Sequence, residues 1–242
     1  MHGRVVVGAR SLFNNEEMLS EAIPGAEVLA FLSIKPVVCS SFSTSGCQLQ
    51  DLKMVEIQGD AIAIEDYAFQ GCSSLARVTI PNSVTRLGDC AFEGCSSLAS
   101  VTIPNSVTEI GLCAFSSCSS LSSVAIPDSV TGLGDCAFEG CSSLASVTIP
   151  NSLTNMGDCA FRGCSSLASV TIPDSVTELG DYAFEGCRSL ASVTIPNSVT
   201  GIGAAAFSGC SSLAGVTMPD SVTYIGERVF EGCIFLLESE GT

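Results

Sequence analysis

The sequence predicts a solenoid, a fold in which short repeats stack along one axis around a continuous core, with parallel β-strands lining one face. Apolar side chains alternate with Ser and Thr ahead of a proline in each copy of the repeat. No copy can bury its own apolar residues, so the copies must pack against one another. The repeat length is set by phenylalanines spaced 23 residues apart: Phe69, Phe92, Phe115, Phe138, Phe161, Phe184, Phe207 and Phe230.

Each copy opens with a predicted strand. Val101 and Ile103 alternate with Ser100 and Thr102, which is the period-two pattern of a strand with one buried face. Pro104 cannot donate a hydrogen bond to a neighbouring strand, so it marks the strand end. The strand motifs begin at Leu52, Leu75, Leu98, Leu121, Leu144, Leu167, Leu190 and Leu213.

The second half of each copy predicts a turn, a short apolar pair and a compact helical segment. Val107 and Ile110 follow the turn and precede Gly111. In most copies an aspartate such as Asp89 then stands before Cys-Ala-Phe or a close variant, where it would cap a helix. We therefore expect short helical or 3₁₀ turns and irregular segments on the face opposite the strands.

The unit LxxVxIPxSVTxIGxxAFxxC resembles the LxxLxL signature of leucine-rich repeats, and its Ile-Pro-x-Ser-Val-Thr, Ile-Gly, Ala-Phe and Gly-Cys elements are similar to the BspA-like subclass. The resemblance covers residues 52–242, which we assign to the solenoid, incomplete at its C-terminal end. It implies a curved leucine-rich-repeat solenoid, and the subclass is associated with adhesion and protein binding. Residues 1–51 do not fit the repeat, and we expect them to form an N-terminal cap.

Charge and hydropathy narrow the range of partners. The formal net charge is −16, from 25 acidic and 9 basic residues, which opposes binding to nucleic acid. No apolar stretch reaches the length that spans a bilayer, so we expect no membrane insertion. The N-terminus carries no clean signal segment. We expect a cytoplasmic protein, with a cell-surface or secreted location as the alternative if the natural chain starts earlier.

Twelve of the 14 cysteines fall into two repeat columns. In the second column Tyr67, Tyr182, Ala205 and Arg228 replace cysteine, which disulfide or metal chemistry would rarely tolerate. No C-x-x-C pair is present. We predict reduced cysteines acting as small packing residues. The first column is Cys72, Cys95, Cys118, Cys141, Cys164, Cys187, Cys210 and Cys233, and the second is Cys90, Cys113, Cys136 and Cys159.

The sequence offers little for catalysis, so we predict a protein that is not an enzyme and that uses no cofactor or metal. Its one histidine, His2, lies at the N-terminus, and no GxSxG, P-loop or HExxH motif appears in the sequence. The GxGxxA match that starts at Gly201 uses the repeat residues Gly203 and Ala206. Acids recur in columns such as that of Asp66, where a calcium site is conceivable but solvation and solubility are the simpler explanation.

Variation between copies indicates where a protein partner could bind. It concentrates at the position before the Ile-Gly pair. A second variable position of the repeat and two positions where arginine replaces the usual serine supply further candidates. We expect a scaffold or adhesion surface that binds through many weak contacts, because the solenoid has few aromatic anchors. The candidate residues are Arg86, Glu109, Asn155, Glu178 and Tyr224, then Arg162, and then Arg77 and Arg188.

An alternative is an ordered-surface binder. A column of threonines, broken by Ala125 and flanked by serines, runs along the predicted strand face and could match the lattice of ice or a polysaccharide. The last full repeat has no evident cap, so end-to-end self-association is a further expectation. The threonines are Thr79, Thr102, Thr148, Thr171, Thr194 and Thr217.

Overall fold

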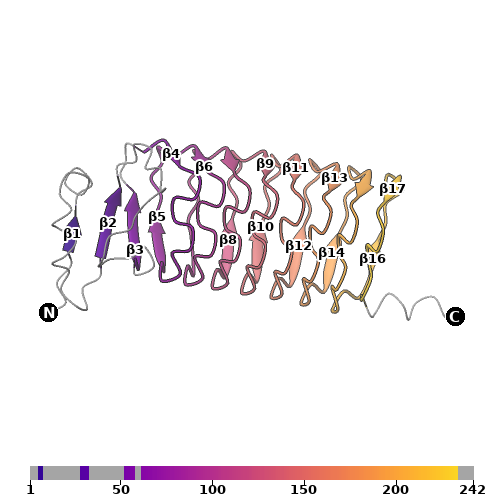
Figure 1. Cartoon of the computed structure of the whole chain (residues 1–242). Helices are drawn as coiled ribbons and strands as arrows, with labels where there is room; N and C mark the ends of the chain where they lie inside the picture. The colour runs from indigo at the N-terminus through magenta and orange to yellow at the C-terminus, as the bar shows by residue number, and fades with distance from the viewer. Residues whose placement is uncertain (1–4, 8–27, 33–51, 58–60, 234–242) are drawn as a thin grey trace.

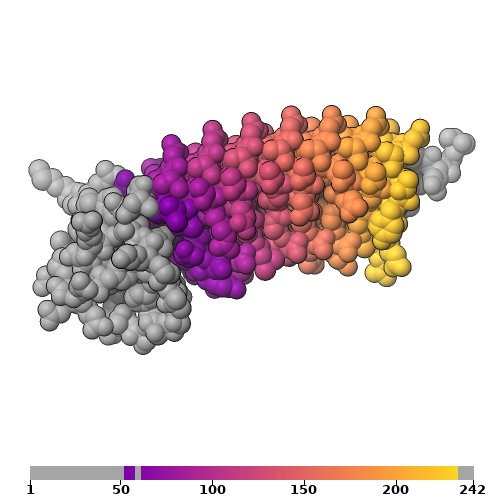
Figure 2. Space-filling view, turned by 90° about the horizontal axis from the view of Figure 1, so that it is seen from above, coloured from indigo at the N-terminus to yellow at the C-terminus, as the bar shows by residue number. Residues whose placement is uncertain are grey.

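The computed structural model describes residues 5–7, 28–32, 52–57 and 61–233. Successive 23-residue units, here called coils, stack in chain order into an elongated rod (Figure 1, Figure 2). The predicted parallel-strand solenoid is confirmed. The predicted cap at residues 1–51 falls largely outside the described residues and stays a prediction, as does the end of the solenoid beyond residue 233.

The predicted strands, joined by strands at residues 5–7 and 28–32 that the sequence pattern did not predict, form a front row along one side of the rod (Figure 1). All of its paired strands are parallel, and among the described residues they form three sheets, ordered β1-β2-β3-β5, β10-β8 and β12-β14-β16. The predicted strand around Val101 is missing, and only an isolated bridge joins Ser100 to Arg77. The strands are β1 Val5–Val7, β2 Val28–Leu32, β3 Met54–Ile57, β5 Arg77–Thr79, β8 Ser123–Ala125, β10 Ser146–Thr148, β12 Ser169–Thr171, β14 Ser192–Thr194 and β16 Val216–Thr217.

A second row of strands, which the sequence pattern did not predict, forms one continuous parallel sheet along another side of the rod (Figure 1). Each strand is only two residues long, a variable residue followed by a mostly buried apolar one. Its eight strands are β4 Ala63–Ile64, β6 Arg86–Leu87, β7 Glu109–Ile110, β9 Gly132–Leu133, β11 Asn155–Met156, β13 Glu178–Leu179, β15 Gly201–Ile202 and β17 Tyr224–Ile225.

The third side of each coil consists of hydrogen-bonded turns, and no helix occurs in the described part of the chain. The expectation of helical or 3₁₀ turns was therefore wrong for these residues. Cys90 has φ 53° and Gly94 has φ 70°, and left-handed residues cannot continue a right-handed helix. The N–H of Cys90 instead donates to Leu112 O of the next coil at 2.7 Å, while that of Ala91 donates to Gly88 O of its own coil at 3.3 Å.

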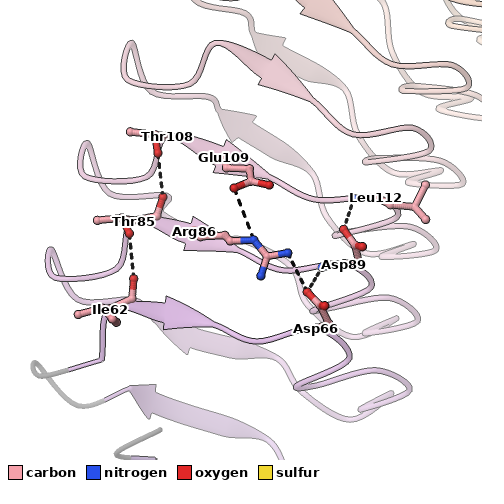
Figure 3. A network of polar contacts seen from close by, with 8 residues as sticks. All are labelled: Ile62, Asp66, Thr85, Arg86, Asp89, Thr108, Glu109 and Leu112. Atoms are coloured by element: carbon pink, nitrogen blue, oxygen red, sulfur yellow. Dashed lines mark hydrogen bonds and ion pairs between the residues drawn. The ribbon is translucent and has the colours of Figure 1, made fainter. Parts of the chain in front are cut away.

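The aspartates expected to cap helices instead join neighbouring coils. Asp66 Oδ1 accepts the backbone N–H of Asp89 at 2.8 Å, and Asp89 Oδ1 accepts that of Leu112 at 2.9 Å (Figure 3). The local cap was the wrong assignment because the donor lies 23 residues ahead in the chain. The same bond recurs from Asp158 to Asp135, from Asp181 to Asp158 and from Ala204 to Asp181.

The core repeats the same contacts in every coil. The phenylalanine rings stack at centroid distances of 5.2 to 5.7 Å and within 10° of parallel. Leucines of the repeat and the first cysteine column fill the space around them and are buried. The thiol of Cys95 donates to Phe69 O of the preceding coil at 3.2 Å. The equivalent bonds are made by Cys118, Cys141, Cys164, Cys187, Cys210 and Cys233.

Candidate binding surfaces

The variable residues before the Ile-Gly pair become a single line on the molecule. Each one is the first residue of a strand in the eight-stranded sheet, and the strand registers pair Arg86 with Glu109 and Gly201 with both Glu178 and Tyr224. We call this line the outer column. It consists of Arg86, Glu109, Gly132, Asn155, Glu178, Gly201 and Tyr224.

Arg86 lies between two acids of neighbouring coils (Figure 3). Its Nη2 is 3.0 Å from Asp66 Oδ1, and its Nε is 3.5 Å from Glu109 Oε2. Burial alone would lower the pKa of Arg86, but the charges of Asp66 and Glu109 outweigh it and raise that pKa. The guanidinium is therefore already held by carboxylates of its own chain.

A shallow recess of about 440 Å³ opens in the outer column around Gly201. A Cβ placed on Gly201 would lie 3.6 Å from Glu178 Cγ and 3.7 Å from Tyr224 Cδ1, so these two side chains flank the space that glycine leaves empty. Tyr224 is 63% exposed. The rest of the lining is polar at Asp158, Asp181, Thr200 and Thr223. Leu179, Gly180 and Gly203 complete it.

The other arginine candidates lie away from the outer column. Arg162 is on the turn side, where its Nε is 2.7 Å from Glu185 Oε2 and its Nη1 is 3.5 Å from Glu139 Oε1. Its guanidinium carbon also lies 5.8 Å from the ring centroid of Tyr182. Arg188 is exposed in a turn, and Arg77 is exposed on β5 of the front row. The eight candidates therefore divide among three sides rather than form one site.

The six predicted lattice threonines are all exposed on the front row. Thr171, Thr194 and Thr217 are direct neighbours on β12, β14 and β16. The array is not continuous, because Thr102 lies outside any strand and β10 is not hydrogen-bonded to β12. A regular repeat therefore extends over only part of the face.

The second cysteine column lies on the turn side at left-handed positions. Burial raises the pKa of Cys90 to about 12, with a further contribution from Glu93, which keeps the thiol protonated and unreactive at neutral pH. No disulfide joins the described cysteines from Cys90 to Cys233. Within the described ranges, no group of three or more His, Cys, Asp or Glu side chains is placed to hold a metal ion. The same ranges contain no helix long and apolar enough to cross a bilayer.

Sequence reasoning named most of the outer column but not the recess. It treated Gly201 as one variant of the varied column and assigned the aspartates to helix caps. A usable signal was present, because Asp181 precedes Gly201 by the same 20 residues that separate Asp66 from Arg86. That spacing matters only once the coil geometry brings the two positions together.

Comparison with known proteins identifies the repeat. The BspA type leucine-rich repeat region matches residues 40–150 and 132–239. A leucine-rich repeat protein of T. pallidum superposes with a TM-score of 0.65 at 36% identity, covering 73% of this chain and 86% of that protein. One from Bacteroides ovatus superposes with a TM-score of 0.55 at 27% identity, covering 86% of this chain and 73% of that protein.

A third solved structure, a leucine-rich cell surface protein of Faecalibacterium prausnitzii, gives a TM-score of 0.51 at 30% identity. It covers 74% of this chain and 62% of that protein. No curated protein sequence matches the chain. The repeat, the coil geometry and the match over most of the chain agree, and the chain belongs to the BspA-type leucine-rich repeat family.

Proposed function

We propose that the protein is a non-catalytic interaction module that binds a protein partner along the outer column. Membership of a leucine-rich repeat family supports a binding role in general terms. The choice of surface comes from this chain. A scaffold and an adhesion surface would both use such a module, and they differ in the compartment where the partner is found.

One observation carries the proposal. The copies are nearly identical in their core and turn residues, yet the outer column holds a positive, an aromatic, an amide and two negative side chains in addition to two glycines. These residues follow one another on a single continuous sheet. Exposed side chains that differ from coil to coil, as at Glu109, Asn155 and Tyr224, can distinguish partners, whereas the repeated Ser and Thr of the front row offer similar groups in most coils.

The outer column favours many modest contacts over one strong one. Tyr224 is its only aromatic residue, and aromatic and arginine anchors dominate strong interfaces. Arg86 is already paired with Asp66 and Glu109. Contacts repeated along a rigid rod still give high avidity when a partner engages several coils together.

The experiment compares two sets of exposed residues on the same rod. Cross-linking of the purified protein in an extract of its source organism, followed by mass spectrometry, supplies a partner whose affinity is then measured with pure components. The combined variant Glu109→Ala, Asn155→Ala and Tyr224→Ala should lose that affinity. The matched variant Thr148→Ala and Thr171→Ala on the front row should keep it, and the opposite pattern would refute the assignment of the surface.

Compartment and self-association are also part of the proposal. We propose a cytoplasmic scaffold, because the buried thiols donate hydrogen bonds to backbone carbonyls as protonated groups and such thiols persist in reducing compartments. The cell-surface description of the Faecalibacterium prausnitzii structure supports the alternative of an adhesin. Light scattering of the purified protein measures whether it also associates end to end.

Ordered-surface binding remains a second candidate, favoured by the neighbouring Thr171, Thr194 and Thr217 on three paired strands. It has weaker support than the outer column because the threonine array is interrupted elsewhere. Thermal hysteresis and binding to a polysaccharide panel test it, and the Thr171→Ala and Thr194→Ala variant should abolish any such activity. Activity that survives this variant would exclude the front row as its source.

A further inference from the structure

Gly201 occupies the same place in its coil that Arg86 occupies in an earlier one, since five repeats of 23 residues separate them. By the same spacing, Asp181 corresponds to Asp66 and Tyr224 to Glu109. The two coils can therefore be compared position by position. The later coil lacks the guanidinium, has Glu178 in place of Ala63 and has Tyr224 in place of Glu109.

The earlier coil shows how this place accommodates a guanidinium. The Arg86 side chain reaches Asp66 at 3.0 Å and Glu109 at 3.5 Å (Figure 3). Asp66 Oδ1 also accepts the backbone N–H of Asp89 at 2.8 Å. In this coil the position between Asp66 and Glu109 therefore already holds the guanidinium of an arginine from the same chain.

The later coil keeps the acceptor and lacks the arginine. Asp181 Oδ1 accepts the backbone N–H of Ala204 at 2.6 Å, the bond that orients Asp66 in the earlier coil. Glu178 adds a carboxylate on the neighbouring strand, where the earlier coil has Ala63. The recess is lined by Asp158, Glu178 and Asp181 and by no lysine, arginine or histidine, so its charge is uncompensated.

We propose that this recess binds the guanidinium of an arginine side chain from a partner protein, in the place that Arg86 fills for itself. Carboxylates of Asp181 and Glu178 accept its N–H groups, and the exposed ring of Tyr224 offers a face for stacking. The turn side of this chain shows the same combination, because Arg162 lies over the ring of Tyr182 while pairing with Glu185. The proposal rests on the proposed function, since the recess is part of the outer column.

Gly132 supplies an internal control. It is the other glycine of the outer column, but Leu112 stands where Asp181 would be and Asn155 where Tyr224 would be. A Cβ on Gly132 would meet nothing nearer than 3.8 Å, and one on Gly201 nothing nearer than 3.6 Å. Both glycines therefore accept a side chain without backbone strain, and only one of them is surrounded by a site for arginine.

The test uses the full chain and three blocked tripeptides, acetyl-Gly-X-Gly-amide with X as arginine, lysine or citrulline, titrated by calorimetry and by NMR of the tyrosine rings. Citrulline keeps the shape of arginine and removes its charge. The variant Gly201→Arg fills the recess from within, and Gly132→Arg adds the same charge elsewhere on the column. Circular dichroism confirms that both variants fold.

We expect the arginine peptide to bind the wild type and Gly132→Arg alike, and to bind Gly201→Arg at least about tenfold more weakly. The citrulline peptide should bind about tenfold more weakly than the arginine peptide, with lysine in between. Equal binding to both variants, equal binding of the three peptides, or no binding would each overturn the recess. If the outer-column variant still loses its protein partner in that case, the proposed function stands without the arginine site.

Discussion

A glycine follows every strand of the eight-stranded sheet except β4, and replacing it should destabilise the fold; Gly134 is a clear case. A Cβ there would lie 2.5 Å from both Gly111 C and Leu112 N of the preceding coil, where ordinary contact begins at 3.4 Å. Those atoms are backbone, so no side chain can move aside. The two coils would have to separate by about 0.9 Å to admit one methyl group.

The separation has a cost that can be estimated. It strains the hydrogen bond from Gly134 N–H to Ile110 O, now 2.9 Å, which contributes about 1 kcal/mol. Overpacking typically costs about 1–3 kcal/mol, and reduced freedom of the unfolded chain returns about 0.4–1 kcal/mol. We expect Gly134→Ala to lower the free energy of unfolding by about 1–3 kcal/mol on balance.

Gly132, two residues earlier in the same coil, is the matched control. A Cβ there would lie 3.8 Å from Asn155 Cβ, so Gly132→Ala should be neutral or stabilise by up to about 1 kcal/mol. Equilibrium unfolding in urea, followed by circular dichroism, measures both variants, and equal m-values are needed for the comparison. Equal midpoints for the two variants would refute the claim that coil spacing, rather than loss of glycine, determines stability.

Three further predictions follow from the contacts between coils. Phe138→Ala should lower the free energy of unfolding by about 3–5 kcal/mol because Phe138 is fully buried. Phe230→Ala should lower it clearly less, because Phe230 is only partly buried. Equal losses for the two variants in urea unfolding would argue against the stack as a continuous core. Asp158→Ala should lower the free energy of unfolding by about 1–2 kcal/mol, because it removes the acceptor for Asp181 N–H. Asp158→Asn keeps an acceptor oxygen and should lower it less. Identical losses would indicate that the charge of Asp158, rather than this hydrogen bond, stabilises the fold. Burial raises the pKa of Cys141 to about 12, so its thiol stays protonated in the fold while the unfolded thiol ionises above about pH 8.5; stability should be full below that pH and fall as pH rises toward 12. Cys141→Ala should make that fall shallower by up to about 1.4 kcal/mol per pH unit, measured in urea with reductant present, and an unchanged slope would show that this thiol is not buried as described.

The front row was predictable because its signals are local. Alternation such as that from Ser169 to Ile172, where β12 forms, and the recurring Phe-containing motif are visible in a single copy and are reinforced by repetition. The eight-stranded sheet was not, because a two-residue strand such as β6 is too short to show a period. Its pairing depends on the neighbouring coil, whose matching residues lie 23 positions away.

The turn side was misjudged for a related physical reason. Asp89 before an Ala-Phe pair is a good helix cap by local rules, yet its carboxylate bonds Leu112 in the next coil. Cys90 at φ 53° is a conformation that non-glycine residues rarely adopt, and composition alone does not indicate it. The outer column was found through variation, but the recess required knowing that Gly201 and Asp181 lie together.

The bonds between coils make the length of the rod adjustable in fixed steps. Most join residues 22, 23 or 26 positions apart, so adding or removing one whole copy re-forms the bonds made by the shared repeat residues, while any other insertion disrupts them. Each added coil moves all later side chains by roughly one strand spacing, about 4.8 Å. Duplication of a single unit can therefore change the distance between two binding side chains, such as those at Arg86 and Tyr224, while leaving each local environment intact. The spacing between two binding residues can therefore change while the contacts around each of them stay the same.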